Sequence, residues 1–411
     1  MTMNPLKSSV ILDVLDALFA LTLVAPAVVG YWRGTWNLMG HYVYTDNEIY
    51  SSFVSLAIGF IGMFIFCLAQ GPIKRYLEGK SNTCFALSSW VYTAVYGFIC
   101  VNSWRGAWLV GNLYQDRSLQ LIIAVTLSAV LLLGLLKTLR NISAPPCVVT
   151  VDDAEDYFDV PTYFKESSHQ KKWLYVIDCL FSVFIVGSLV VVVWRGAWVI
   201  LDNIIFPDDP SLSALASLAL GYGIVILTFS LQPIMRWTCA RLEGFWRVLV
   251  ADLFLFFSFI GTVNVWRSIW QLLDLYFLPE HRIASDWITH AGCLFVLMVL
   301  NCGNSVLVRG VYVDAEENAG DCVMLPVQYL TLYFKREKDK RSRHKSTSEA
   351  LFTKPQHIKF MEQGQECENL SENEQGTTVE DSLLYKHSGP VVVIVTNNTD
   401  ASDKGSQNNC K

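Results

Sequence analysis

The sequence predicts an all-α membrane protein with eight transmembrane helices in two tandem four-helix parallel repeats, followed by a disordered C-terminal tail. Two observations predict this class. Of the 411 residues, 52% are hydrophobic and only 17% are charged, whereas soluble domains carry about 25% charged residues. In addition, one tryptophan motif recurs four times at spacings that repeat. The composition indicates a membrane protein, and the spacings indicate an internal duplication.

Eight apolar stretches have the length of a transmembrane helix. About 20 helical residues cross a hydrocarbon core of about 30 Å. Many of these stretches are continuous apolar runs without the period-2 alternation of a membrane β-strand. The expected helices span residues 10–32, 51–70, 84–104, 119–138, 173–194, 213–232, 246–266 and 288–308.

The first stretch is expected to be a retained helix and not a cleaved signal peptide. Asp13 and Asp16 interrupt its apolar run, and Ala25-Pro26-Ala27 is a poor cleavage site. Its counterpart in the second half, residues 173–194, lies in the middle of the chain, where a signal peptide does not occur.

Each odd-numbered helix is expected to end in a Trp-Arg-x-x-Trp motif. Successive copies start 104−32 = 72, 194−104 = 90 and 266−194 = 72 residues apart, so alternate copies stand 162 apart. Flanking residues keep this shift, since Ser55-Leu56-Ala57 matches Ser217-Leu218-Ala219. The fourth copy departs from the others by having Ser268-Ile269 at its centre. The motif residues are Trp32, Arg33, Trp36, Trp104, Arg105, Trp108, Trp194, Arg195, Trp198, Trp266, Arg267 and Trp270.

The duplication sets the domain organisation. Each half has four expected helices, an even number, so the second half enters the membrane in the same direction as the first. We expect a first four-helix repeat at 1–145, a cytoplasmic linker at 146–172, a second four-helix repeat at 173–334 and a cytoplasmic disordered tail at 335–411.

The distribution of basic residues predicts the orientation. Cytoplasmic loops are enriched in Lys and Arg. With a cytoplasmic N-terminus, 13 of the 19 basic residues in 1–334 lie on the inner side, and four of the other six are the motif arginines. Both termini are therefore expected in the cytoplasm, with the four motifs near the outer surface.

Two interpretations of the motif remain open. Tryptophans at membrane interfaces form an aromatic belt, in which a neighbouring arginine extends to water. Alternatively, the four arginines converge and need acidic partners. Positions seven residues after Arg195 and Arg267 hold Asp202 and Asp274, whereas the first half has Gly40 and Asn112 there. Pairing of Arg33 or Arg105 with Asp274 or Asp202, across the halves, is a hypothesis.

Two acids that the repeat matches, Asp16 and Asp178, fall inside expected membrane helices. Intramembrane carboxylates are costly and face a bundle interior or a cavity. A structural role, in which each bonds a neighbouring helix end, and a cation or proton site are both open at this point.

The tail begins with a basic run at 335–345 and continues with a Gln-, Glu-, Asn- and Ser-rich segment, which is typical of disorder. A basic run beside a helix attracts anionic lipids by about 1 kcal/mol per residue. A stop-transfer flank with a solvated tail is the alternative. Nucleic-acid binding has no support beyond this run.

Enzyme signatures are missing. The sequence has no H-E-x-x-H, G-x-S-x-G or Walker motif, and no C-x-x-C pair that indicates a zinc site. We therefore expect no catalytic residues, no cofactor and no metal.

Eight expected helices in two halves, with Trp-Arg-Gly-x-Trp motifs and cytoplasmic termini, resemble the fuseless family of invertebrate neuronal membrane proteins over about residues 10–330. The resemblance implies a non-enzymatic, multi-pass protein of the presynaptic plasma membrane. It also implies a role in localising voltage-gated calcium channels at active zones, with channel subunits or scaffold proteins as partners, and so in neurotransmitter release. The alternative is a secondary transporter or channel-like protein that uses the intramembrane Asp residues.

Overall fold

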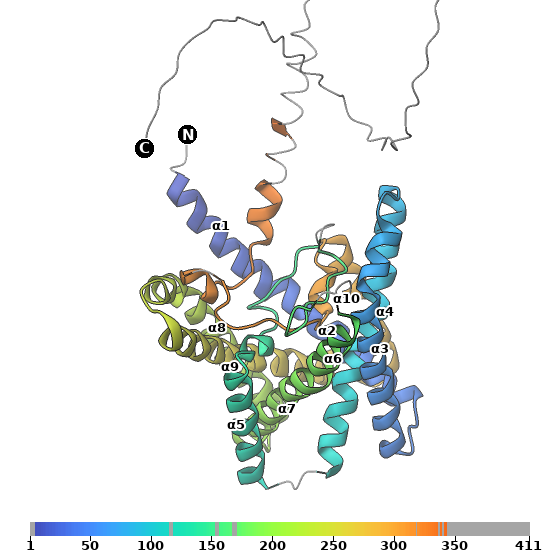
Figure 1. Cartoon of the computed structure of the whole chain (residues 1–411). Coiled ribbons are helices and arrows are strands. Elements are labelled where there is room, and N and C mark those ends of the chain that lie inside the picture. The colour runs from blue at the N-terminus through green and yellow to red at the C-terminus, as the bar shows by residue number, and fades with distance from the viewer. Residues whose placement is uncertain are drawn as a thin grey trace, which may run out of the picture. The chain divides into compact units, whose positions relative to one another are not determined.

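The computed structural model describes residues 5–114, 118–152, 156–166, 171–317, 319–335, 338 and 341–342 (Figure 1). They belong to one compact unit, Met1–Glu349, and a second unit, Ala350–Lys411, lies outside the described residues. The predicted basic run at 335–345 and the tail after it are also largely outside them. Within the described ranges the chain is all-helical, as predicted.

Seven helical segments are long and apolar enough to cross a membrane. The eighth apolar helix, α5 (Leu119–Leu135), has 17 residues. The seven segments are Ile11–Tyr42 (α1 Pro5–Phe19, η1 Ala20–Val24 and α2 Ala25–Tyr42), α3 (Glu48–Leu77), α4 (Asn82–Tyr114), Lys172–Ile204 (α6 Lys172–Leu180, η3 Phe181–Val186 and α7 Gly187–Ile204), α8 (Pro210–Cys239), α9 (Gly244–Tyr276) and Pro279–Val299 (η4 Pro279–His281 and α10 Arg282–Val299).

The helices pack in pairs around four inner helices. Helix α3 packs on α4, α8 on α9, α10 on α2, and α5 on α7. The inner members α2, α4, α7 and α9 also contact one another in that cyclic order. Figure 1 shows α3 beside α4 and α8 beside α9. The inner helices thereby surround a common axis.

Polar residues lie inside this bundle, and apolar residues cover much of its outside. Ile61, Leu131 and Leu253 are each more than half exposed. The fully or nearly fully buried side chains include Arg33, Arg267, Asp16 and Asp178. A surface of this kind suits a hydrocarbon solvent, in which charged groups must find partners inside the protein. The chain is a helical membrane protein.

Helix bounds and caps recur at the shift found in the sequence. Helices α3 and α8 have 30 residues each, α4 and α9 have 33 each, and both pairs start 162 residues apart. The N-cap residues Asn47 and Asp209 are also 162 apart, and each accepts a hydrogen bond from the third backbone amide of its helix. A π-helical turn interrupts both Ile11–Tyr42 and Lys172–Ile204, at η1 and η3.

Several predicted helix ends are wrong. The inner helices do not end at the motif but continue six residues beyond its second tryptophan. Conversely, the stretches predicted at 119–138 and 288–308 end at Leu135 and Val299. Lys137 and Asn301, just after those ends, adopt left-handed backbone conformations with φ of 52° and 53°. A left-handed residue cannot continue a right-handed helix, so the chain turns there.

After these turns the chain folds back among the helices and the two halves exchange caps. The Asp152 carboxylate accepts backbone N–H bonds from Gly303 and Asn304, both at 3.0 Å. The Asp314 carboxylate accepts them from Leu139 at 2.7 Å and Arg140 at 2.8 Å. These amides start the short 3-10 helices η5 (Gly303–Val306) and η2 (Leu139–Ile142). Part of the expected linker is therefore buried, and the two halves supply hydrogen-bond acceptors to each other.

We expect removal of either cap to destabilise the protein. Asp152→Ala or Asp314→Ala leaves two buried backbone amides without acceptors, which costs about 1–3 kcal/mol for each unsatisfied group. Thermal unfolding of the full chain in detergent measures the loss. The exposed Asp208→Ala is the control and should leave the midpoint within experimental error. An unchanged midpoint in both cap variants would contradict the assignment.

Candidate functional site

Four tryptophans, one from each inner helix, form a closed ring of edge-to-face contacts. Successive ring centroids are 5.3, 5.7, 5.3 and 5.6 Å apart, and the planes meet at 67–85°. Aromatic pairs prefer this edge-to-face arrangement because the positive edge of one ring meets the negative face of the next. This first tryptophan ring consists, in order, of Trp32 (α2), Trp104 (α4), Trp194 (α7) and Trp266 (α9).

A second tryptophan ring lies one helical turn further along. Its centroid separations are 5.7, 5.8, 5.8 and 5.8 Å, with planes at 84–88°. Residues four apart face the same side of a helix, so a motif that places one tryptophan in the first ring also places the next in the second. The second ring consists of Trp36, Trp108, Trp198 and Trp270.

The first ring is buried, which contradicts the aromatic-belt interpretation. Its members are 3–9% exposed. Three of their indole N–H groups donate to loop carbonyls: Trp32 to Val306 and Trp194 to Ile142, both at 2.9 Å, and Trp266 to Pro145 at 2.7 Å. The loops that fold back into the bundle therefore contact this ring through their backbone carbonyls.

Three motif arginines donate a hydrogen bond to a side chain on the preceding helix of the ring. In each case that side chain lies seven positions after the motif arginine of its own helix. Arg267 Nε donates to Asp202 at 2.7 Å, and Arg33 Nε donates to Asp274 at 2.7 Å. Arg195 Nε donates to Asn112 Oδ1 at 2.9 Å. The hypothesis of a pair across the halves holds for Arg33 and Asp274. Asp202 of α7 pairs with Arg267 instead of Arg33 or Arg105, because α9 follows α7 in the order of the ring.

Arg105 has equivalent surroundings except at the acceptor position on the preceding helix, where Gly40 stands. Its Nη1 donates to Ser55 Oγ at 2.6 Å and its Nη2 to Ser51 Oγ at 2.9 Å. Arg267 makes the equivalent bonds to Ser217 at 2.6 Å and Ser213 at 2.7 Å. The Nε of Arg105 is buried, and no described residue accepts a hydrogen bond from it.

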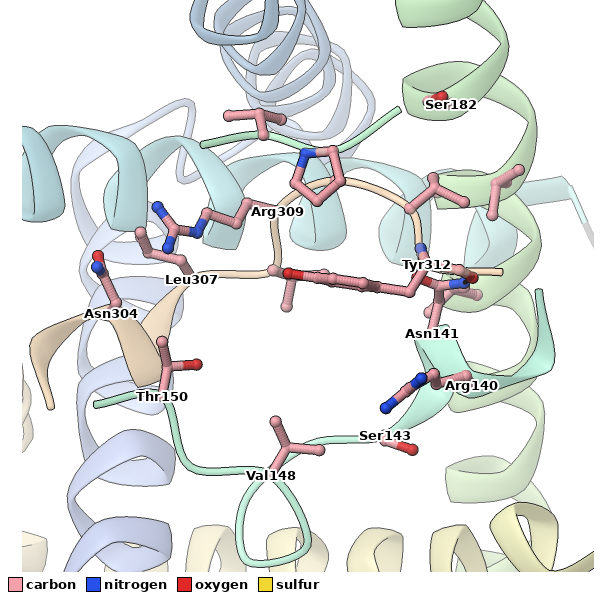
Figure 2. Close-up of a pocket in the computed structure, with 18 of the residues that line it drawn as sticks. Arg140, Asn141, Ser143, Val148, Thr150, Ser182, Asn304, Leu307, Arg309 and Tyr312 are labelled. Atoms are coloured by element: carbon pink, nitrogen blue, oxygen red, sulfur yellow. Dashed lines mark hydrogen bonds between the residues drawn. The ribbon is translucent and has the colours of Figure 1, made fainter. Parts of the chain in front are cut away.

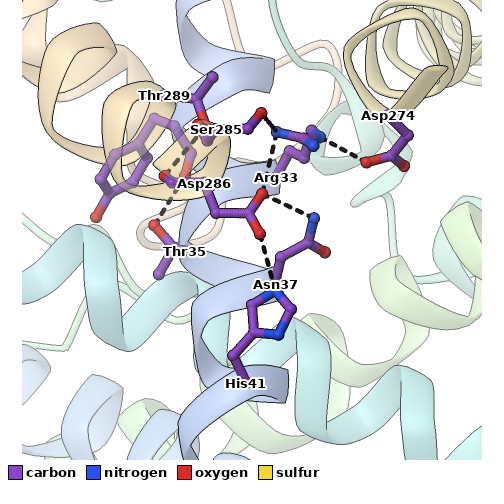
Figure 3. A network of polar contacts seen from close by, with 9 residues as sticks. Arg33, Thr35, Asn37, His41, Asp274, Ser285, Asp286 and Thr289 are labelled. Atoms are coloured by element: carbon purple, nitrogen blue, oxygen red, sulfur yellow. Dashed lines mark hydrogen bonds and ion pairs between the residues drawn. The ribbon is translucent and has the colours of Figure 1, made fainter. Parts of the chain in front are cut away.

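Arg33 lies at the centre of a larger polar network (Figure 3). Besides Asp274, its Nη1 contacts Asp286 at 3.1 Å and Ser285 Oγ at 3.2 Å. Asp286, on α10, also bonds Asn37 and His41 of α2, both at 3.1 Å. The close approach of α10 depends on small residues, since a Cβ at Gly34 would lie 2.5 Å from the Asp286 carbonyl oxygen.

Asp16 and Asp178 both accept hydrogen bonds from backbone amides at the other end of the bundle. Asp178 accepts from Phe164 at 2.9 Å and Glu166 at 3.2 Å. Asp16 accepts from the amides of Leu330 and Thr331 and from the Thr331 hydroxyl at 2.7 Å. The acceptors are almost fully buried. In Figure 1, α1 accordingly lies beside the helical turn at residues 329–335.

A cavity of about 540 Å³ lies next to the first tryptophan ring (Figure 2). It is enclosed by the helices and by the two loops that fold back among them, residues 139–152 and 301–314, here called the re-entrant loops. Figure 2 shows Val148, Thr150, Leu307 and Tyr312 around it. Its lining combines apolar side chains with a few polar groups, among them Arg140 and Arg309. Sequence reasoning missed it because loop residues without a motif form much of its wall. The sequence Val148-Val149-Thr150-Val151, unusually apolar for a solvated linker, is the available signal.

Asp152, the partly buried cap close to this cavity, has a perturbed pKa. Burial raises the pKa of Asp152 to about 6, while its two backbone N–H donors act in the opposite direction. Among the described residues no group of three His, Cys, Asp or Glu side chains is arranged to hold a metal ion.

The fold and the site define a helical membrane protein whose inner helices meet through aromatic rings and buried arginines. The chain belongs to the Fuseless family, whose family model matches residues 11–307. No curated protein and no solved structure matches the chain. The match to the family model confirms the family that the sequence predicted.

We expect the first tryptophan ring to be a stability determinant. Trp194→Phe removes the N–H donor to the Ile142 carbonyl and part of two edge contacts, so the free energy of unfolding should fall by about 1–3 kcal/mol. The control Trp246→Phe changes a tryptophan that is 62% exposed and should be nearly neutral. Thermal unfolding in detergent provides the comparison, and equal tolerance at both positions would show that the first tryptophan ring does not determine stability.

Proposed function

We propose that this protein is a non-enzymatic, multi-pass organiser of the presynaptic plasma membrane, which supports localisation of voltage-gated calcium channels and so synaptic transmission. Membership of the Fuseless family supports this proposal, because the family is linked to presynaptic function. Calcium channel subunits or scaffold proteins are the proposed partners, besides the lipid bilayer.

The closed tryptophan rings are the observation that favours an organiser. Two stacked rings with centroid separations of 5.3–5.8 Å cross the common axis of the inner helices. The carboxylates proposed for a cation site, Asp16 and Asp178, each already accept at least two backbone amide bonds. Buried and hydrogen-bonded in this way, they serve packing better than ion binding. A rigid core suits a protein that presents surfaces to partners.

The proposed topology has eight transmembrane helices in two tandem four-helix repeats, with both termini in the cytoplasm. The shift of 162 residues in motif, helix bounds and caps supports the repeats. The excess of basic residues on one side supports the orientation. The basic run at 335–345 then lies beside the inner leaflet, where we propose that it contacts anionic lipids.

Glycosylation mapping tests this topology. An acceptor site inserted between Pro207 and Pro210, in the connection from α7 to α8, should be modified because we place it outside the cell. An acceptor after Lys345 should remain unmodified. A gel shift sensitive to glycosidase reports both, and the reverse pattern would overturn the orientation.

The second candidate is a secondary transporter or channel-like protein. The cavity of about 540 Å³ favours it, since a solute site of that size is ordinary for small-molecule binding. The two functions can be separated experimentally at this cavity. A transporter needs the cavity to be empty, whereas an organiser does not.

In neurons lacking the protein, we expect Val148→Trp, which places a large ring against the cavity, to restore calcium channel density and transmitter release as well as the wild-type chain does. Val148→Ile is the matched control. Surface abundance of each variant and co-purification of channel subunits are measured together. Loss of release by Val148→Trp at normal abundance and with normal channel recovery would favour transport.

A further inference from the structure

The four motif arginines have four equivalent positions for a hydrogen-bond acceptor, and three of these positions hold a side chain that accepts from the arginine. The residues there are Asp202, Asp274 and Asn112, each at 2.7–2.9 Å from the Nε of the next arginine. The fourth position belongs to Gly40, which has no side chain to offer Arg105. The missing acceptor is thus defined by the geometry of the other three.

Arg105 is a buried cation without a described counter-ion. Its side chain is 5% exposed, its Nε has no described acceptor, and its other nitrogens bond only neutral oxygens of Ser51 and Ser55. Glu48, in the first turn of α3, is exposed; it attracts Arg105 electrostatically but does not form a described ion pair with it. A buried cation whose Nε has no described acceptor is costly, so an anion from solution that accepts from this Nε would stabilise the protein.

Space for such an anion lies directly beside the guanidinium. A pocket of about 440 Å³ is lined by Gly40, Arg105, Arg33, His41 and Arg282, together with Asp274 and Asp286. Both carboxylates in this lining are already engaged by Arg33, at 2.7 and 3.1 Å. Three arginines against two acids leave the pocket with one positive charge in excess. A Cβ at Gly40 would meet only Arg105 Nη2, at 3.7 Å, so the acceptor position is open.

We propose that this pocket binds a small monovalent anion, chloride or a carboxylate, which accepts from Arg105 where the other arginines use a residue of the chain. A guanidinium matches a carboxylate in shape and charge, and a spherical chloride fits the same N–H donors. An anionic lipid headgroup is a second source of the same chemistry. The site is independent of the proposed function.

Substitution of Gly40 tests the site, because an aspartate there supplies the missing carboxylate from within. The full chain is purified in neutral detergent, and its thermal unfolding is followed while chloride or acetate is titrated at constant ionic strength with a bulky sulfonate. Wild type and the control Gly40→Ala should gain on the order of 2–4 °C with saturation. Gly40→Asp should start at a higher midpoint without anion and gain nothing. Gly40→Asn, the residue type at the Arg195 position, is the second variant and should show a reduced response.

A further arm separates the two sources of anion. Mixed micelles with an anionic phospholipid replace the salts, and stabilisation of wild type and Gly40→Ala by the lipid alone assigns the site to a headgroup. An equal shift in wild type and Gly40→Asp, or in Gly40→Asn if the aspartate variant does not fold, would overturn the proposal. So would the absence of any response to all three anions in wild type.

Discussion

The edge-to-face contact between tryptophans of neighbouring inner helices is the constraint on which the rest of the structure depends. Each ring closes on itself, so every inner helix is held by two neighbours at centroid separations of 5.3–5.8 Å. The indole N–H groups then fix the loops, because they donate to Val306, Ile142 and Pro145. Bilayers supply no hydrophobic driving force between helices, and well-packed aromatic and polar contacts of this kind take its place.

Burial of three motif arginines, Arg33, Arg105 and Arg267, follows from the same arrangement. The ring brings the arginine of one helix next to the residue two turns further along its neighbour, and aspartate, asparagine or glycine stands there. The partners therefore differ around the ring: Arg33 contacts two acids, whereas Arg105 has serine oxygens only. Because the arginines recur on all four inner helices and their acidic partners do not, the end of the bundle that carries the motifs has a different site on each side.

Part of this could be predicted from sequence, and part could not. The shift of 162 residues, the spacing of four within the motif and the acids seven positions on are all readable, because helical periodicity maps sequence distance onto position. Whether Trp32 faces lipid or the axis is not readable, since the same amphipathic ring suits both places. Nor is the order of helices around the ring, which decides that Asp202 serves Arg267 and not Arg33.

The re-entrant loops show why linkers were the least predictable part. Gly, Asn, Pro and Asp residues at 139–152 and 301–314 are typical of solvated connections, yet Ile142, Cys147 and Val306 are fully buried. Some of the loop amides bond within their own loop, as Cys147 does to Ala144. The amides that start the two 3-10 helices instead find their acceptors in the other loop, at Asp314 and Asp152. Since each loop supplies the carboxylate that caps the 3-10 helix of the other, the two loops stabilise each other, and a pairing of this kind leaves no signal in either half alone.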